Sequence, residues 1–320
     1  MKSFSMIFHE EVITSGRMNP EIDPVLTIWG WEIPLYLYLG GLVAGILFFS
    51  AYYVIRHRED EYPTAVKMAP MWAPPLIVIG LLTLLLDLSH WPYFWRLYTT
   101  LHLESPMSWG AWTLGVITPL SFLWAALWLE EAFPRFSWPF LWMRGVINTI
   151  HYFRVALAWL ILVLAVLLGV YTGILLSAFN ARPFWNSGIL GPLFLVSGLS
   201  TGTALVMLTA KSHHEREHFS RIDLMLIGIE LFMIVHLFMG FFASTEVHVE
   251  AAKLFLGGPY TAPFWVLVVG LGLVVPALIE LLGVARQKVP VQVPAALVLV
   301  GGLVLRFIVL DAGLGSRWLY

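Results

Sequence analysis

The sequence predicts an all-α integral membrane protein with eight transmembrane helices, arranged as two four-helix bundles. Of its 320 residues, 59% are hydrophobic and only 12% are charged, and the mean hydropathy is +0.81. This composition is far more apolar than that of an average soluble domain. Several runs reach the ~20 apolar residues that a helix needs to cross a ~30 Å hydrocarbon core, whereas a barrel would show short alternating segments. No segment is left for a soluble domain, so residues 1–320 are expected to form a single membrane domain.

The first four expected helices each bring polar or aromatic residues to one end of the predicted bundle. They lie near residues 31–55, 68–89, 107–130 and 151–178. The residues at this end are Glu32 and Tyr36 in the first helix, Asp87 and His90 in the second, Ser108 and Trp109 in the third, and Tyr171 in the fourth. The first helix also contains the run GGLVAG, which is typical of a close contact between two helices.

The last four expected helices lie near residues 188–210, 221–243, 263–285 and 292–311. Glu230 and His236 stand inside the sixth helix, and Arg306 and Asp311 lie toward the end of the eighth. Asp311 is close enough to the helix end for its carboxylate to reach the headgroup region. Arg306 has two interpretations, since its side chain either extends outward to water or pairs with Asp87 or with a ligand.

The distribution of positive charge predicts that both termini lie on the outer side of the membrane. Cytoplasmic loops carry an excess of lysine and arginine. One set of loops holds eleven such residues and the other side holds six. The eleven are Arg56, Arg58, Lys67, Arg135, Arg144, Arg154, Lys211, Arg216, Arg221, Arg286 and Lys288. The first thirty residues lack a basic start followed by an apolar stretch, so we expect no cleavable signal. With this orientation, the polar positions of five helices belong to the outer leaflet.

The cysteine and histidine content argues against a redox centre held by this chain. Cysteine is absent, so any thiolate-ligated iron–sulfur cluster has to belong to another subunit. Bis-histidine haem ligation needs two facing histidines at similar depth, and of the ten histidines only His236 lies well inside a helix. The segment KSHHEREHFSR has metal-like spacing, but its mixed charge in a short loop favours a solvated anchor. A net charge of −2 without a basic tract argues against nucleic acid as a partner.

Five stretches of the sequence resemble the NrfD/PsrC family, in the same order along the chain. They are WGWEIPLYLYLGGLVAG, LLDLSHWPYFW, SPMSWGAW, LAVLLGVYTGILLSAFNARPFWN and LRFIVLDAG, and the resemblance extends over all eight helices. The resemblance implies a haem-free, multi-pass subunit of the cytoplasmic (inner) membrane that exchanges electrons between quinone and an extracytoplasmic iron–sulfur subunit. The iron–sulfur subunit in turn serves a catalytic reductase subunit. The resemblance also implies a quinone pocket toward the outer face.

The resemblance suggests which residues bind the quinone. Tyr171, in GVYTG, matches the tyrosine that hydrogen-bonds a quinone carbonyl in the polysulfide reductase membrane subunit. A histidine and an asparagine in the first helix of that subunit align with Tyr36 and Ile33, and a tyrosine at the first of these positions is similar to the nitrite-reductase-associated branch. Arg306 matches an arginine in the last helix of both branches. The expected quinone site comprises Tyr36, Ser108, Trp109, Tyr171 and Arg306.

Quinol oxidation needs hydrogen-bonding groups around an apolar slot and a route for two protons. Quinone carbonyls accept hydrogen bonds and quinol hydroxyls donate them, and tyrosine can do either without carrying a charge into the membrane. An aspartate kept out of water can accept and pass on a proton near neutral pH. We therefore expect Asp87, His90 and Glu32 to form a proton exit beside the quinone. The rival interpretation makes Asp87 an ionised partner of Arg306 that joins the second and eighth helices.

The outer loops are rich in aromatic residues, which are common both at protein interfaces and at the headgroup level of membranes. We expect Trp95, Arg182 and Trp185 to dock the iron–sulfur subunit.

Two other functions remain open. A proton-conducting or transporter-like protein would use the same acids in an ion path, but a full path needs polar residues in both leaflets. A purely structural anchor leaves Glu32, Asp87 and Tyr171 without an explanation.

Overall fold

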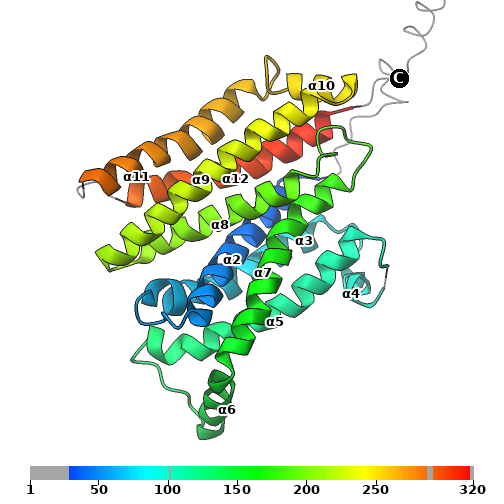
Figure 1. Ribbon diagram of the computed structural model, residues 1–320. Helices are drawn as coiled ribbons and strands as arrows, with labels where there is room; N and C mark the ends of the chain where they lie inside the picture. Colours follow the sequence, from blue (N-terminus) through cyan, green and yellow to red (C-terminus); the bar gives the residue numbers. More distant parts are fainter. Residues whose placement is uncertain (1–28, 101, 287–290, 318–320) are drawn as a thin grey trace, which may run out of the picture.

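The computed structural model of the protein confirms the all-α membrane fold. It describes residues 29–100, 102–286 and 291–317, and no strand occurs among them. Eight helices of this described part are long and apolar enough to cross a membrane. They are α2 (Glu32–Ile55), Thr64–Asp87, α5 (Pro106–Ala132), α7 (Arg154–Ser177), α8 (Leu190–Thr209), α9 (His213–Phe242), Pro263–Gly283 and α12 (Gln292–Gly315) (Figure 1). The first 28 residues and Lys288, on which the signal and orientation predictions partly rest, lie outside the described residues.

The eight spans form two four-helix bundles, as the sequence predicts. The span Thr64–Asp87 ends in α3 (Ala73–Asp87), and Pro263–Gly283 consists of η5 (Pro263–Val274) and most of α11 (Val275–Arg286). In the first bundle, α2 and α5 each pack against both α3 and α7. In the second, α8 and α11 each pack against both α9 and α12. Because α2 and α8 join the two bundles, they are the most buried spans. In an 18-residue apolar stretch of each span, 83% of α2 and 78% of α8 is buried, against at most 56% for any other span.

Glycines bring α2 and α8 into backbone contact. A Cβ atom on Gly45 would lie 2.2 Å from the carbonyl oxygen of Gly198, and one on Gly202 would lie 2.6 Å from the carbonyl carbon of Gly45. Gly41 and Gly198 are also close, since a Cβ atom on Gly198 would lie 2.7 Å from the carbonyl oxygen of Gly41. Small residues allow helix backbones to approach in this way. The close helix contact predicted from GGLVAG is confirmed.

The second span begins as a π-helix, η2 (Thr64–Met68), and a 3-10 helix, η3 (Ala69–Trp72). Pro70 has no N–H group, so the carbonyl of Val66 loses its usual i+4 partner. The hydroxyl of Ser50 on α2 donates to that carbonyl at 3.1 Å and accepts from Nε1 of Trp124 on α5 at 2.8 Å. The Ser50 hydroxyl therefore replaces the missing backbone donor, as is usual where proline interrupts a transmembrane helix, and Trp124 in turn donates to that hydroxyl.

Four short helices connect the spans and were not predicted. They are η4 (Trp91–Tyr93), α4 (Arg96–Thr99), α6 (Leu141–Tyr152) and α10 (Glu246–Lys253). The sixth span also differs from the prediction, because α9 begins at His213 rather than near residue 221. The charged segment expected to be a loop is therefore the first part of a helix.

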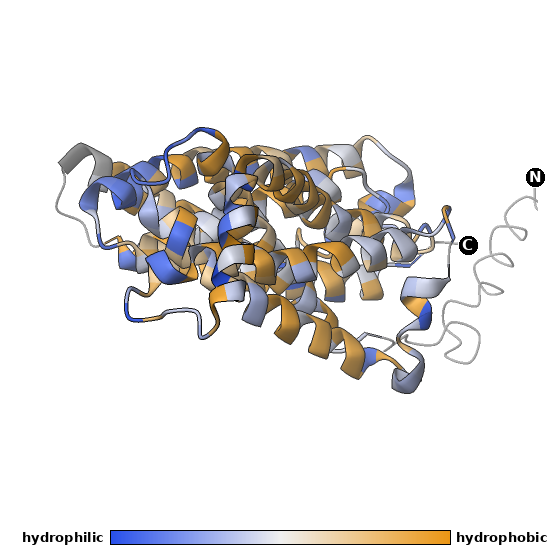
Figure 2. Cartoon of the chain, turned by 90° about the horizontal axis from the view of Figure 1, so that it is seen from below, coloured by the Kyte–Doolittle hydropathy of each residue, from blue (hydrophilic) through white to orange (hydrophobic). Residues whose placement is uncertain are grey.

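Both ends of the described chain lie at the same end of the molecule, which we call the terminal end. Trp29 packs against Trp185, with ring centroids 5.4 Å apart, and Nη1 of Arg182 donates to the carbonyls of Leu314 and Ser316 at 2.9 and 3.1 Å. The opposite end, which carries α6, is called the far end (Figure 1). Hydrophilic colour gathers toward these ends and hydrophobic colour dominates the helices between them (Figure 2). That the terminal end faces the outside stays a prediction.

Candidate functional site

A small apolar cavity, which we call the inner pocket, lies near the terminal end. The four spans of the first bundle surround it, together with residues of the segments that connect them. Tyr36 of α2, Asp87 of α3, Tyr98 of α4 and Tyr171 of α7 line it. Its other lining residues are Trp29, Ile33, Leu84, Leu88, Leu97, Met107, Ala111, Leu114 and Leu175. The structure thus brings together three residues that the sequence singled out, from three separate helices. The cavity holds only about 90 Å³, less than the ~300 Å³ of a small ligand pocket, so a bound ring has to extend beyond it.

The tyrosine hydroxyls of the inner pocket have no partners within the described part of the chain. Tyr36 is only 3% exposed, yet no hydrogen bond to its hydroxyl or to that of Tyr171 occurs among the described residues. The two phenols are close enough for their charges to interact if ionised. Burial raises the pKa of Tyr98, the third phenol, which lies outside the membrane spans. The pocket therefore offers neutral hydroxyl groups to a ligand.

Asp87 is the last residue of α3 and lines the inner pocket. Glu32, in the first turn of α2, is close enough for its charge to act on Asp87. His90 lies beyond the end of α3 and is exposed. Together with Ser108 it lines a neighbouring cavity, the end pocket, which shares Leu88 with the inner pocket. Asp87 and His90 therefore lie in adjoining cavities.

Trp109 and Tyr171 line a third cavity, a groove between α5 and α7. Leu167 and Ile174, which also line it, are 49% and 45% exposed on a membrane-spanning helix, so the groove faces the lipid. Nε1 of Trp109 already donates to the carbonyl of Leu103 at 2.7 Å. Trp109 thus contributes its ring to this groove, while its only hydrogen-bond donor is engaged within the protein.

Arg306 does not belong to this group of residues. Its side chain is 1% exposed and donates to Ser197 Oγ at 2.5 Å and to the carbonyls of Phe194 and Gly302 at 3.1 and 3.2 Å. The guanidinium carbon also lies 4.7 Å from the centroid of the Phe194 ring. Among the described residues it makes no ion pair with Asp87, so the rival interpretation of Asp87 as its partner is wrong. The sequence prediction grouped Arg306 with Asp87 by their depth in the membrane, and depth alone does not show that Arg306 faces α8.

The second bundle buries acids that the sequence interpretation largely missed. Asp223 of α9 is fully buried and accepts hydrogen bonds from Ser200 Oγ at 2.6 Å and from Thr203 Oγ1 at 2.8 Å. Glu280 of α11, only 2% exposed, is close enough to interact with it. Glu230 is also buried on α9. Asp223 and Glu230 stand at positions i and i+7 of one helix, and this shared face is the signal that could have identified Asp223.

Two of the three expected docking residues have internal roles instead. Trp185 is 2% exposed, and its Nε1 donates to the carbonyl of Val309 at 2.8 Å. Arg182 ties the same loop to the end of α12. Trp185 is thus corrected from a docking residue to one that fixes this loop. Trp95, 49% exposed at the terminal end, has a surface that a partner can reach.

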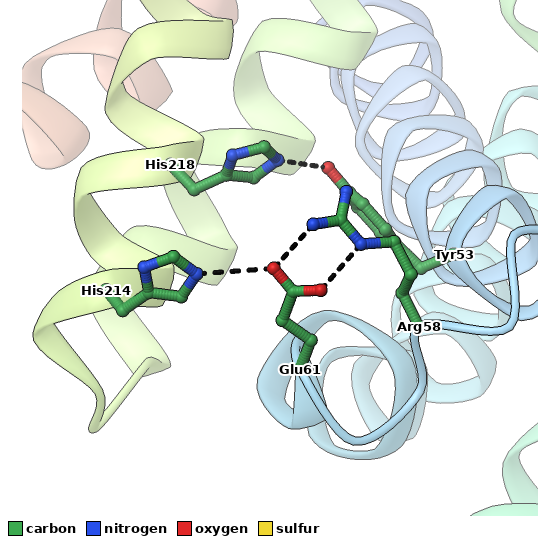
Figure 3. Close-up of polar contacts among 5 residues, drawn as sticks. All are labelled: Tyr53, Arg58, Glu61, His214 and His218. Carbon is green, nitrogen blue, oxygen red and sulfur yellow. Dashed lines mark hydrogen bonds and ion pairs between the residues drawn. The ribbon is translucent and has the colours of Figure 1, made fainter.

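A second polar cluster lies at the far end, where α9 meets the segment after α2 (Figure 3). Nε2 of His218 lies 2.7 Å from the hydroxyl of Tyr53, and Arg58 donates twice to Glu61, at 2.6 and 2.5 Å. His214 lies 3.4 Å from the same carboxylate. The hydrogen bonds from Arg58 lower the pKa of Glu61 to about 2. In the described part of the chain no group of three or more histidine or acidic residues is placed to hold a metal, and these histidines contact tyrosine and carboxylate groups.

Comparison with known proteins agrees with the resemblance seen in the sequence. The chain is 32% identical over 303 residues to protein NrfD of Escherichia coli (strain K12), which covers 89% of this chain and 95% of that protein. It is 30% identical over 303 residues to the C chain of polysulfide reductase from Wolinella succinogenes, with 89% and 94% coverage. A protein NrfD homolog of Haemophilus influenzae is 25% identical over 302 residues, again with 89% and 94% coverage. The family model described as "Polysulphide reductase, NrfD" matches residues 19–315, nearly the whole chain, and the protein therefore belongs to this family.

Proposed function

We propose that this protein is the quinol-oxidising membrane subunit of a respiratory reductase complex. The observation that carries the proposal is the inner pocket, because Tyr36, Tyr171 and Asp87 line the same apolar space and the two phenol hydroxyls have no partners among the described residues. A quinol head group has two hydroxyls, and tyrosine can accept from them or donate to the carbonyls that replace them. The name of one relative, the C chain of polysulfide reductase, supports a place in a reductase of several chains.

The residues around the pocket suit a reaction that releases electrons and protons together. Oxidation of a quinol to a quinone breaks two O–H bonds and releases two protons and two electrons. Tyr36 and Tyr171 hold and orient the head group, and Asp87 accepts a proton as the electrons leave. The proton then passes to His90 in the adjoining end pocket and from there to water. Glu32, near Asp87, offers a second acceptor.

The electrons require a partner with its own redox centre. The protein has no cysteine, so the accepting iron–sulfur cluster belongs to another subunit. The pocket lies near the terminal end, and the positive-inside distribution favours the outer side for that end. We therefore place the iron–sulfur subunit on the outer face, where Trp95 is available to dock it, with the catalytic reductase subunit behind it.

A second candidate function is proton conduction through the second bundle. The observation that favours it is the set of buried acids Asp223, Glu230 and Glu280, because intramembrane carboxylates are costly and usually mark ion or proton pathways. The protein alone, reconstituted in vesicles with a pH-sensitive dye inside, separates the two candidates. Proton flux without any quinol, and its loss in Asp223→Asn, would support conduction.

The quinol proposal is tested with the purified complex and the water-soluble quinol menadiol. The rate at which menadiol bleaches the iron–sulfur clusters is followed by anaerobic stopped-flow absorbance. Tyr36→Phe and Tyr171→Phe each remove one hydroxyl and keep the ring, so each should raise the half-saturating menadiol concentration by roughly 2- to 13-fold, the equivalent of one hydrogen bond. Tyr52→Phe, on the exposed side of α2 outside the pocket, is the matched control. Wild-type kinetics in both pocket variants would contradict the proposal.

A further inference from the structure

Gly110 of α5 lies directly beneath the phenol ring of Tyr171. A Cβ atom at Gly110 would lie 1.8 Å from Cζ, 2.0 Å from the hydroxyl oxygen and 2.4 Å from Cε1 of that ring. Nonbonded carbon atoms pack at ~3.5 to 4.0 Å, so no residue other than glycine leaves room for the ring in this position. The contact joins α5 to α7 through one side chain, unlike Gly45, whose nearest neighbours are backbone atoms of α8.

The residues on either side of Gly110 line different cavities. Trp109 lines the groove between α5 and α7, which faces the lipid, whereas Ala111 lines the inner pocket. Tyr171 lines both cavities. The phenol ring therefore lies across α5 at Gly110 as the wall between the lipid-facing groove and the inner pocket.

We infer that Gly110 is a positioning residue of the quinone site: by lacking a side chain, it lets the phenol of Tyr171 stand between the groove and the inner pocket with its hydroxyl available to the quinol. This inference rests on the proposed function. It explains why a glycine occurs between two large aromatic residues in the run SWGAW. It also gives the small inner pocket a way to extend, because movement of one ring would connect it with the groove.

The consequence of adding a methyl group at Gly110 follows from the distances. To reach ordinary contact, the ring has to move by about 1.7 Å or more. The obstructing atoms are the far end of a side chain rather than backbone, so the ring can shift while the helices stay in place. Gly110→Ala should therefore act on quinol binding through Tyr171 and spare the fold.

The test uses the complete complex with menadiol as the probe and compares Gly110→Ala, Tyr171→Phe, Tyr171→Ala and Gly110→Ala/Tyr171→Ala. Gly110→Ala should raise the half-saturating menadiol concentration about as much as Tyr171→Phe does, by roughly 2- to 13-fold. The double variant should match Tyr171→Ala alone, because the smaller residue leaves space for the new methyl group. Gly228→Ala is the matched control, since a Cβ atom at this membrane-helix glycine meets nothing within 4 Å.

Each outcome decides the inference. The positioning role is overturned if Gly110→Ala has wild-type kinetics. It is also overturned if Gly110→Ala weakens menadiol binding as much in the Tyr171→Ala background as it does alone. Either result leaves the proposed function intact. Wild-type kinetics in both Tyr171 variants overturns the role of Tyr171 and the positioning role with it. If Gly110→Ala prevents assembly, restoration of assembly by Tyr171→Ala supports the contact, and failure to restore it overturns the contact.

Discussion

At the scale of single residues, Asp87 takes its chemical character from the place where α3 ends. Leu88, the next residue, already has extended backbone angles (φ −73°, ψ 119°), so the helix stops with Asp87 in the lining of the inner pocket. Arg306 is engaged by α8, and no cation forms an ion pair with Asp87 among the described residues. The carboxyl group is therefore placed for proton exchange rather than for an ion pair.

Asp87→Asn should slow quinol oxidation without disturbing assembly. Asparagine keeps the shape of the side chain but is unable to accept the proton, and a positioned general base typically contributes ~10²- to 10⁴-fold to a rate. We expect the limiting rate of cluster bleaching by menadiol to fall by about 10²-fold, with normal co-purification of the partner subunits. Asp311→Asn, an exposed acid on α12, is the control and should behave as wild type. A normal limiting rate in Asp87→Asn would contradict its role as the acceptor.

The sequence identified some site residues and missed others for a physical reason. Tyr36, Asp87 and Tyr171 stand near the same ends of neighbouring helices, so depth along the helix was sufficient to group them. Depth says nothing about rotation around the helix axis. Arg306 has a similar depth but contacts Ser197 and Phe194, which only the packing of α12 on α8 brings near.

At the scale of helices, the spans follow from hydropathy, whereas their boundaries depend on tertiary contacts. The sixth span begins within a charged run, where hydropathy predicts a loop. Its first turns are stabilised by partners from elsewhere in the protein, since His218 contacts Tyr53 and Glu215 accepts a hydrogen bond from the backbone N–H of Ala65 at 2.9 Å. These contacts were not readable from the local sequence. The short helix α6 was missed because it is too short to produce a membrane-spanning signal.

Gly45→Ala should weaken the contact between the two bundles. Its Cβ atom would lie 2.2 Å from the backbone carbonyl oxygen of Gly198, so α2 and α8 have to separate rather than a single side chain moving aside. Overpacking of this kind costs about 1 to 3 kcal/mol, and we expect a lower Tm of the purified subunit in detergent. Gly228→Ala has open space and gains helix propensity of up to ~1 kcal/mol, so its Tm should be equal to or above that of wild type. Equal Tm values for the two variants would contradict the backbone contact.

At the scale of the whole molecule, the two bundles carry different polar groups. The first bundle surrounds the inner pocket near the terminal end, and the second buries Asp223, Glu230 and Glu280. Glycines of α2 and α8 join the bundles within the membrane. At the far end, the cluster of Figure 3 joins them again, because the last turn of α2 and the segment after it contact the start of α9. The relative position of the bundles therefore depends on a close-packed contact and on a polar one.

Within the far-end cluster, the Arg58–Glu61 pair should lose its contribution to stability only in acid. Arg58 lowers the pKa of Glu61 from 4.5 to about 2 in the folded protein. A carboxyl group whose pKa falls on folding stabilises the folded state above its unfolded pKa, and this contribution is lost as the pH falls from about 4.5 through about 2. The difference in Tm between wild type and Glu61→Gln should therefore stay constant above about pH 5 and shrink below it. Because His214 contacts the same carboxylate, the comparison is repeated in a His214→Ala background. If the Tm difference between the proteins with and without Glu61→Gln still varied between about pH 6 and 8 in that background, the Arg58–Glu61 pair would not be the cause of that difference.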